Sequence, residues 1–139
     1  MNPPEFHRIP DIPRLHNVPL AEIQQKQASV TLLLDDAEEQ KMSLRFSPFQ
    51  AMRVTTEDCF DWVPRASIPA GGVYQVVSSP WIAELSASLS KVDRTATFLE
   101  KSIHFLLPAG DKIIEIVAWS VKWEGGNGSG EFPDLVPGS

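Results

Sequence analysis

The stretch TFLEKSIHFLLPAGDKIIEIVAWSVKW, residues 97–123, carries the strongest β signal in the chain. Isoleucine, valine and tryptophan crowd its second half, and these residue types favour strands. A Pro-Ala-Gly-Asp turn divides the stretch, so we predict a long antiparallel hairpin with strands over 97–107 and 112–123. Apolar residues occupy both faces at 113–117, with Glu115 as the exception, which indicates a central strand covered on both sides.

A helix is predicted just before this hairpin. The β-prone residues 73–77 lead into Ser79, which suits an N-cap, and Pro80, which suits the first helical position. An apolar residue at every fourth position predicts a helix over about 79–89 with one apolar stripe. Three turns alone are not stable in water, so this stripe must pack on a sheet. The stripe consists of Trp81, Leu85 and Leu89.

Further strands are predicted nearer the N-terminus. Residues 41–46 alternate strictly between polar and apolar side chains, which is the pattern of a half-buried strand. We expect them to pair with the β-prone run 29–34 across an acidic turn, as a second antiparallel hairpin. The other predicted segments are a short helix over 20–27, an interruption at Ser47-Pro48, a strand over 49–55 and a long loop over 57–72.

Proline is the compositional outlier, with 12 residues in 139, and five of the twelve precede residue 20. Prolines at that spacing exclude a regular helix or a central strand there. Apolar side chains recur between them, so we expect residues 1–19 to form an extended arm, packed on its own domain or on a neighbouring subunit. Residues 20–124 are the predicted domain, and 125–139 a glycine-rich tail, with flexibility expected over 125–130.

These elements predict a single α+β domain built on a mainly antiparallel sheet, with one main helix and an extended proline-rich arm. The alternative is a β-sandwich or a partly open barrel. Parallel βαβ units are not expected, because parallel pairing needs crossover connections and only one convincing helix is present.

Charge and cysteine content restrict the partners and the compartment. Twelve lysines and arginines against 18 acids give a formal charge of −6, which argues against nucleic-acid binding and favours a protein partner with a basic surface. Cys59 is the only cysteine, so an internal disulfide is excluded, which fits a reducing compartment. No apolar run is long enough to span a membrane. The N-terminal residues lack the apolar core of a signal peptide. We therefore expect a cytoplasmic protein with no membrane partner. A homodimer stays open, through the N-terminal arm or the C-terminal hairpin.

Candidate site residues are few. The loop over 57–72 combines acids, an aromatic side chain and an arginine, which makes it the best candidate recognition surface. Cys59 lies among carboxylates, the opposite of the setting that activates a thiolate, and is interpreted as inert. No catalytic, metal-binding or cofactor motif is recognised, so we expect no cofactor and no metal. The predicted binding residues are Asp58, Asp61, Trp62, Arg65, His104 and Trp123.

The C-terminal half also carries a resemblance. Residues 73–85, VYQVVSSPWIAEL, and residues 103–118, IHFLLPAGDKIIEIVA, resemble a pattern in a family of small uncharacterised bacterial proteins. In that pattern a strand leads into a Ser-Pro/Glu-Trp helix and then into a His-containing β-hairpin. The resemblance implies a bacterial cytosolic setting and an antiparallel α+β core, and it implies no activity.

Three functional hypotheses follow from the sequence. The first is a non-enzymatic protein-interaction module, accessory or immunity-like, that binds a basic partner. The alternative is a small-ligand-binding protein with an apolar pocket between sheet and helix, gated by residues 56–72. The third, ranked last, is an enzyme that uses His104 with Cys59 or an acid. It requires a cleft that places His104 against a carboxylate.

Overall fold

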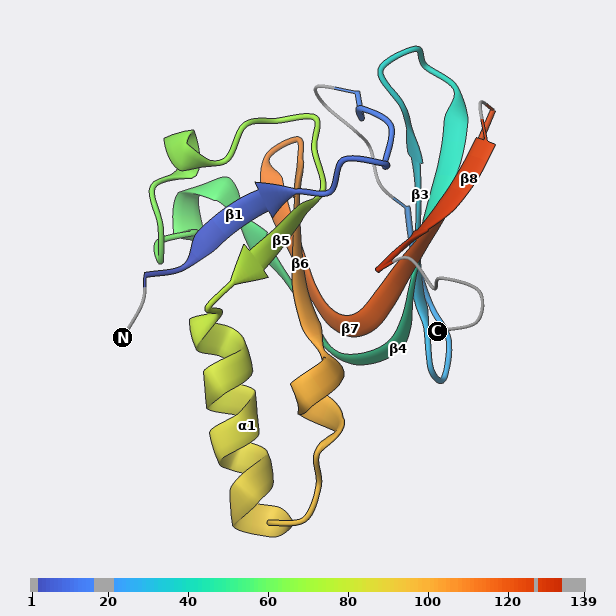
Figure 1. Ribbon diagram of the computed structural model, residues 1–139. Coiled ribbons are helices and arrows are strands. Elements are labelled where there is room, and N and C mark those ends of the chain that lie inside the picture. The colour runs from blue at the N-terminus through green and yellow to red at the C-terminus, as the bar shows by residue number, and fades with distance from the viewer. Residues whose placement is uncertain (1–2, 17–21, 127, 134–139) are drawn as a thin grey trace.

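The computed structural model describes residues 3–16, 22–126 and 128–133 (Figure 1). One antiparallel eight-stranded sheet has the strand order β1-β5-β6-β7-β4-β3-β2, with β8 paired to β7. Within these residues there is a single α-helix, α1 (Pro80–Val92), and it lies at one side of the sheet. This arrangement confirms the predicted α+β fold. The strands are β1 (Glu5–Arg8), β2 (Glu22–Gln25), β3 (Val30–Asp35), β4 (Lys41–Thr56), β5 (Tyr74–Val77), β6 (Ile103–Ala109), β7 (Lys112–Gly125) and β8 (Gly128–Phe132).

The two longest strands, β4 and β7, bend the sheet. They pair with each other over most of their length, and their register shifts between Phe49 and Ala51. A bulge of this kind bends a strand and increases its twist. Figure 1 shows both strands curving together through the middle of the sheet. The β3 and β8 half is thereby turned toward the β5 and β6 half.

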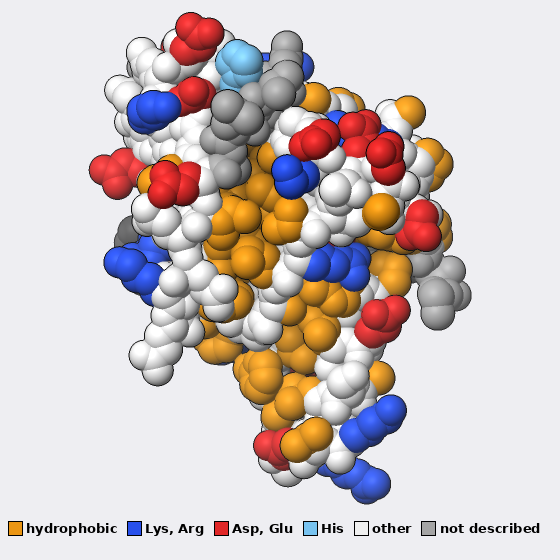
Figure 2. All heavy atoms as spheres, turned by 180° about the vertical axis from the view of Figure 1, so that it is seen from behind, with side chains coloured by type: hydrophobic (Ala, Val, Ile, Leu, Met, Phe, Trp, Pro, Cys, Tyr) orange, Lys and Arg blue, Asp and Glu red, His pale blue; other side chains and the backbone are white. Residues whose placement is uncertain are grey.

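The inner face of the bent sheet forms the main hydrophobic core. Phe46 of β4 and Phe105 of β6 come from the two halves and meet edge to face, with ring centroids 5.1 Å apart. The segment that follows β1 crosses this core and buries three apolar side chains between its prolines. They are Ile9, Ile12 and Leu15. Seen from behind, hydrophobic side chains form a band through the middle of the molecule; most acidic side chains lie away from this band, and some basic ones lie beside it (Figure 2).

The opposite face of β5, β6 and β7 carries a second, smaller cluster. Its buried members include Leu106 of β6 and Ile113 of β7, and Ile68 of the 57–72 loop packs against them. That loop contains two short 3-10 helices, Glu57–Cys59 and Arg65–Ser67. Side chains alternate along a strand, so β6 directs Phe105 into the main core and its neighbour His104 to this second face.

The predicted start of the helix is confirmed. The Ser79 side chain accepts a hydrogen bond from the backbone N–H of Ile82, and Pro80 occupies the first turn. Ser78, just before the N-cap, has a positive φ of 58°. The helix runs to Val92, and none of its residues is fully buried, so its apolar stripe is only half covered.

Four sequence predictions are wrong in detail. In place of the predicted helix over 20–27, Glu22–Gln25 forms the strand β2. Its pairing with β3 in a hairpin outweighs the weak helical propensity of these residues. Residues 20 and 21 lie outside the described residues. Ser47-Pro48 does not interrupt β4, because the proline stands next to the bulge, where a proline is tolerated. Residues 98–101 form a 3-10 helix, not strand, and 128–132 of the predicted tail form β8.

Candidate ligand pocket

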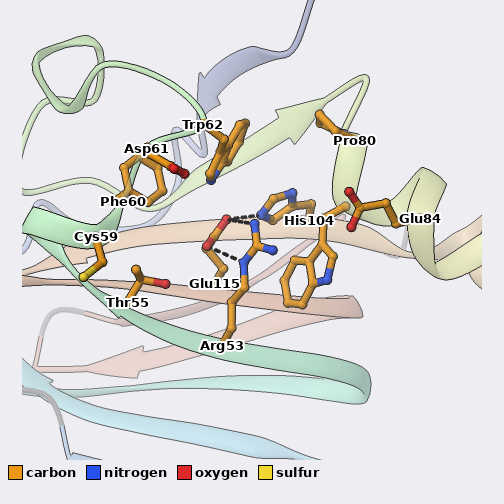
Figure 3. A pocket seen from close by; sticks show the side chains of 11 residues that line it. Arg53, Thr55, Cys59, Phe60, Asp61, Trp62, Pro80, Glu84, His104 and Glu115 are labelled. Carbon is orange, nitrogen blue, oxygen red and sulfur yellow. Dashed lines mark hydrogen bonds and ion pairs between the residues drawn. The ribbon is translucent and has the colours of Figure 1, made fainter.

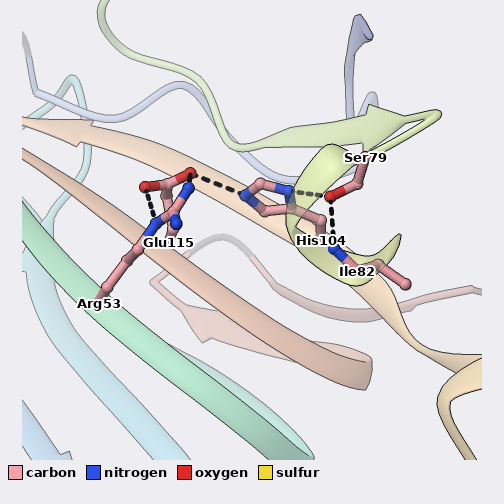
Figure 4. A network of polar contacts seen from close by, with 5 residues as sticks. All are labelled: Arg53, Ser79, Ile82, His104 and Glu115. Carbon is pink, nitrogen blue, oxygen red and sulfur yellow. Dashed lines mark hydrogen bonds and ion pairs between the residues drawn. The ribbon is translucent and has the colours of Figure 1, made fainter. Parts of the chain in front are cut away.

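A line of four polar side chains crosses the second face of the sheet (Figure 4). Arg53 of β4 stands opposite Glu115 of β7 in the strand register, and its guanidinium donates to both carboxylate oxygens, at 2.7 and 3.1 Å. His104 Nε2 lies 2.9 Å from Glu115 Oε1, and His104 Nδ1 lies 2.7 Å from Ser79 Oγ. Three neighbouring strands and the start of α1 thus meet in one hydrogen-bonded chain.

His104 is neutral within this chain. It is fully buried, and burial lowers its pKa below the usual value of 6.5, although the hydrogen bond to Glu115 acts the other way. Because a carboxylate only accepts hydrogen bonds, the imidazole proton is assigned to Nε2, which donates to Glu115. Nδ1 then accepts from the Ser79 hydroxyl. Ser79 Oγ in turn accepts from the Ile82 N–H, so the chain ends at the helix cap.

Glu115 is ionised although it is 1% exposed. Burial by itself would raise its pKa, but the hydrogen bonds from His104 and Arg53, together with the positive charge of Arg53, outweigh burial and lower it. An isolated buried carboxylate would be very costly, and two hydrogen bonds from one guanidinium compensate that cost. Arg53 also lies over the Trp81 ring, 4.1 Å from its centroid, which holds the guanidinium in place.

A cavity of about 260 Å³ opens above this chain, between α1, β4 and the residues that follow it (Figure 3). Its volume is slightly below the range of about 300–1,000 Å³ that is usual for drug-sized ligands, so it suits a smaller molecule. The Trp62 ring lies 5.7 Å from the His104 ring and the Trp81 ring 5.3 Å from it, so the imidazole lies between two indoles. The lining residues are Arg53, Thr55, Cys59, Phe60, Asp61, Trp62, Pro80, Trp81, Glu84, His104 and Glu115.

Of the six residues predicted from the sequence, the pocket brings three together: Asp61, Trp62 and His104. Asp58 is exposed and does not line it. Arg65 donates to the Ile68 carbonyl and pairs with Glu57, so it holds the loop together.

Trp123 lies elsewhere, against β8. A side chain at Gly130 would come within 2.5 Å of the Trp123 indole nitrogen, so glycine is required for this close packing. The Trp123 Nε1 and the Trp62 Nε1 are both buried without a hydrogen-bond partner. The Trp123 side chain belongs to a shallower hollow formed with β3, β4 and β8.

The sequence did not identify Arg53, Ser79 or Glu84 as site residues. Glu115 stood out only as a charged residue within a predicted buried strand. Glu115 was the one detectable signal, because it is the only charge in the otherwise apolar run 113–117. Arg53 gave no such signal, since an arginine in an alternating strand is the expected outward-facing residue.

The described residues contain no helix with the length and hydropathy needed to cross a bilayer. Within the same ranges, no group of three His, Cys, Asp or Glu side chains is arranged to hold a metal ion. Comparison of the chain with protein-family models, with curated proteins and with solved structures finds no match.

Proposed function

We propose that the protein binds a small organic molecule in the pocket between α1, β4 and the 59–62 segment. The observation that carries the proposal is the Arg53–Glu115 ion pair, hydrogen-bonded to a neutral His104, at the base of an open cavity. Small-molecule sites combine apolar walls with a few fixed polar groups, and this pocket has indole walls above a charged base.

The cost of burying the Glu115 charge supports a role beyond stability. Apolar side chains of similar volume fill such a position as well as a buried ion pair does, and often better. An arginine held by two hydrogen bonds and an indole is also pre-organised, so binding would cost little additional side-chain entropy. The hypothesis of an interaction module for a basic protein remains a prediction. Its test is a pull-down at low salt, and recovery of no basic partner would remove its main support.

The four tryptophans offer a direct test. Trp62 and Trp81 line the pocket, whereas Trp119 and Trp123 do not. We would titrate a library of polar fragments into ¹⁵N-labelled protein and follow the four indole N–H signals. Saturable shifts of Trp62 and Trp81, with Trp119 and Trp123 unmoved, support the proposal. If no fragment shifts the first pair, or if every hit shifts all four signals alike, the pocket is not a ligand site.

A second readout uses the pocket's thiol. Cys59 is exposed, lines the cavity and is the only cysteine, so a bound fragment should slow its alkylation. The matched variants are Trp62→Phe, which alters one wall, and Trp119→Phe, which makes the same chemical change outside the pocket. Protection should weaken in the first variant and persist in the second.

Acyl transfer is a second candidate, favoured by the Ser79–His104–Glu115 line. A serine, a base and an acid within hydrogen-bond reach are the arrangement that activates a serine nucleophile. Two features weigh against it: Ser79 Oγ already accepts the Ile82 N–H, and Pro80 has no N–H to stabilise an oxyanion. Labelling by a fluorophosphonate that Ser79→Ala abolishes and Ser88→Ala preserves would favour this candidate over simple binding.

A further inference from the structure

The charges that line the pocket do not balance. Arg53 is the one cation among the lining residues, and Glu115 already meets it with both carboxylate oxygens. His104 is neutral, because burial lowers its pKa. Asp61 and Glu84 remain, and neither has an ion-pair partner within the described part of the chain. The pocket therefore has an excess of two negative charges.

These two carboxylates face the cavity from opposite sides. In Figure 3 the Asp61 carboxylate points inward beside Trp62, and the Glu84 carboxylate points inward from α1. A ligand anion would meet both of them and Glu115 as well. A ligand cation would lie between them and be attracted by both, although Asp61 and Glu84 are exposed and water screens part of this attraction.

The aromatic walls favour the same sign of charge. An indole ring attracts a cation to its face, and the pocket already contains one such contact, between Arg53 and Trp81. Trp62 supplies a second indole, with Phe60 beside it at a centroid distance of 5.6 Å. Two aromatic rings and two carboxylates around one cavity form the surroundings that a guanidinium or an alkylammonium group prefers.

A hydrogen-bond donor in the pocket lacks its acceptor. Trp62 Nε1 is buried and has no partner, and an indole N–H can only donate. Buried donors in native proteins nearly always meet an acceptor. Nε1 is closed to solvent, so a ligand oxygen would satisfy this donor after a small shift of the side chains that cover it, while the charged group lies between the carboxylates.

We propose that the ligand is an organic cation, a guanidinium or alkylammonium compound, that also carries an accepting oxygen such as a carbonyl. This inference rests on the proposed function and narrows it to one class of ligand. The same chemistry occurs in a free small molecule and in an arginine or lysine side chain of a bound protein. The formal charge of −6 on the whole chain attracts either one.

Three probes separate the contributions. Nα-acetyl-arginine amide has the cation and the carbonyl oxygens, Nα-acetyl-citrulline amide has the same shape without charge, and butylguanidinium has the charge without the carbonyl. With the Trp62 and Trp81 signals as readout, the arginine compound should bind about tenfold more tightly than the citrulline compound. Butylguanidinium should bind several-fold more weakly than the arginine compound, because Trp62 Nε1 stays unpaired.

Charge-removing variants locate the effect in the pocket. Asp61→Asn and Glu84→Gln should each weaken binding of the arginine compound several-fold and leave the citrulline compound almost unaffected. The matched control is Asp58→Asn, three residues from Asp61 and outside the pocket, which should change neither affinity. Added salt should weaken binding of the arginine compound alone.

The source of the cation is tested with the arginine placed inside a blocked Ala-Arg-Ala peptide. If the peptide binds as tightly as Nα-acetyl-arginine amide, the natural ligand is a side chain of a bound protein. If the peptide binds more weakly, the natural ligand is a free molecule. Both results support a cation. Equal binding of the citrulline and arginine compounds, or tightest binding of Nα-acetyl-glutamate, would overturn the cation inference and leave the proposed pocket standing. Failure of every fragment and probe to move the two indole signals would overturn the proposed function itself.

Discussion

The two faces of β6 and β7 differ in what they bury. Toward the main core these strands direct only apolar side chains, such as Phe105 and Ile116, and the interior around them is apolar. Toward the other face the same strands direct His104 and Glu115 among apolar neighbours. Since successive residues of a strand point to opposite sides, a single pair of strands supplies both a stabilising core and a polar site.

The covers of the two faces differ as well. The segment after β1 closes the main core with three residues that are at most 2% exposed, Ile9, Ile12 and Leu15. Over the other face, α1 has no buried residue, and a cavity remains between the helix and the 59–62 segment. A completely filled face contributes stability, whereas an incompletely covered face with fixed charges is suited to binding. Substitutions on the first should therefore affect folding most.

The largest effect is expected from Leu15→Ala, which removes a fully buried side chain from the main core. The free energy of unfolding should fall by about 2–5 kcal/mol, measured by urea denaturation, because both transfer energy and a cavity are involved. Ile23→Ala in β2 is the matched control, since Ile23 is 36% exposed, and it should cost far less. Equal losses in the two variants would show that the arm does not close the core.

The next effect is expected from Glu115→Gln, which keeps the shape and removes the charge. Arg53 and His104 would lose a charged acceptor, and we expect a loss of about 1–3 kcal/mol. Glu124→Gln on the same strand changes an exposed residue and should stay within about 0.5 kcal/mol of the parent. A Glu115→Gln variant as stable as the parent would mean that the attraction between Arg53 and Glu115 only balances the free-energy cost of removing these charges from water.

Elements with strong local signals could be predicted from the sequence. The alternation over 41–46, the β-prone run 112–123 and the Ser79-Pro80 helix start depend on residues next to each other in the chain, and the structure contains all three. The strand β2 could not be predicted, because its conformation depends on pairing with β3 and not on its own weak pattern.

The site depended on long-range contacts. Arg53 lies 62 positions from Glu115 in the sequence, and Ser79 lies 25 positions from His104. Neither contact therefore produces a recognisable local sequence pattern. Two of the acids, Asp61 and Glu115, could be noticed from the sequence as residues in an unusual setting. That they line one cavity follows only from the strand order and from the path of the 57–72 loop.

The pH dependence of stability tests the polar face separately. The pKa of His104 is lower in the folded protein than its usual value of 6.5, so the unfolded chain takes up this proton first. The free energy of unfolding should therefore fall as pH drops below about 6.5, by at most about 1.4 kcal/mol per pH unit for one proton. The pKa of Glu115 is also lowered, so a second loss should begin below about pH 4.5.

The upper step of this profile should disappear in His104→Gln and persist in His7→Gln, because the His7 side chain is 58% exposed. Urea denaturation between pH 5 and pH 8 measures it, a window that spans the usual histidine pKa. An unchanged upper step in His104→Gln would assign the loss to other groups.

The smallest effect is expected where the polar chain ends, at Ser79. Ser79→Ala removes the side-chain cap of α1 and the hydrogen-bond partner of His104 Nδ1, so the loss should be about 1 kcal/mol. Ser88→Ala, in the exposed middle of the same helix, should be neutral or slightly stabilising, because alanine favours the helix. The two roles of Ser79 separate when the substitution is repeated in His104→Gln. If the cap alone counts, the loss is the same in both backgrounds; a smaller loss in the double variant measures the coupling between the helix start and the site.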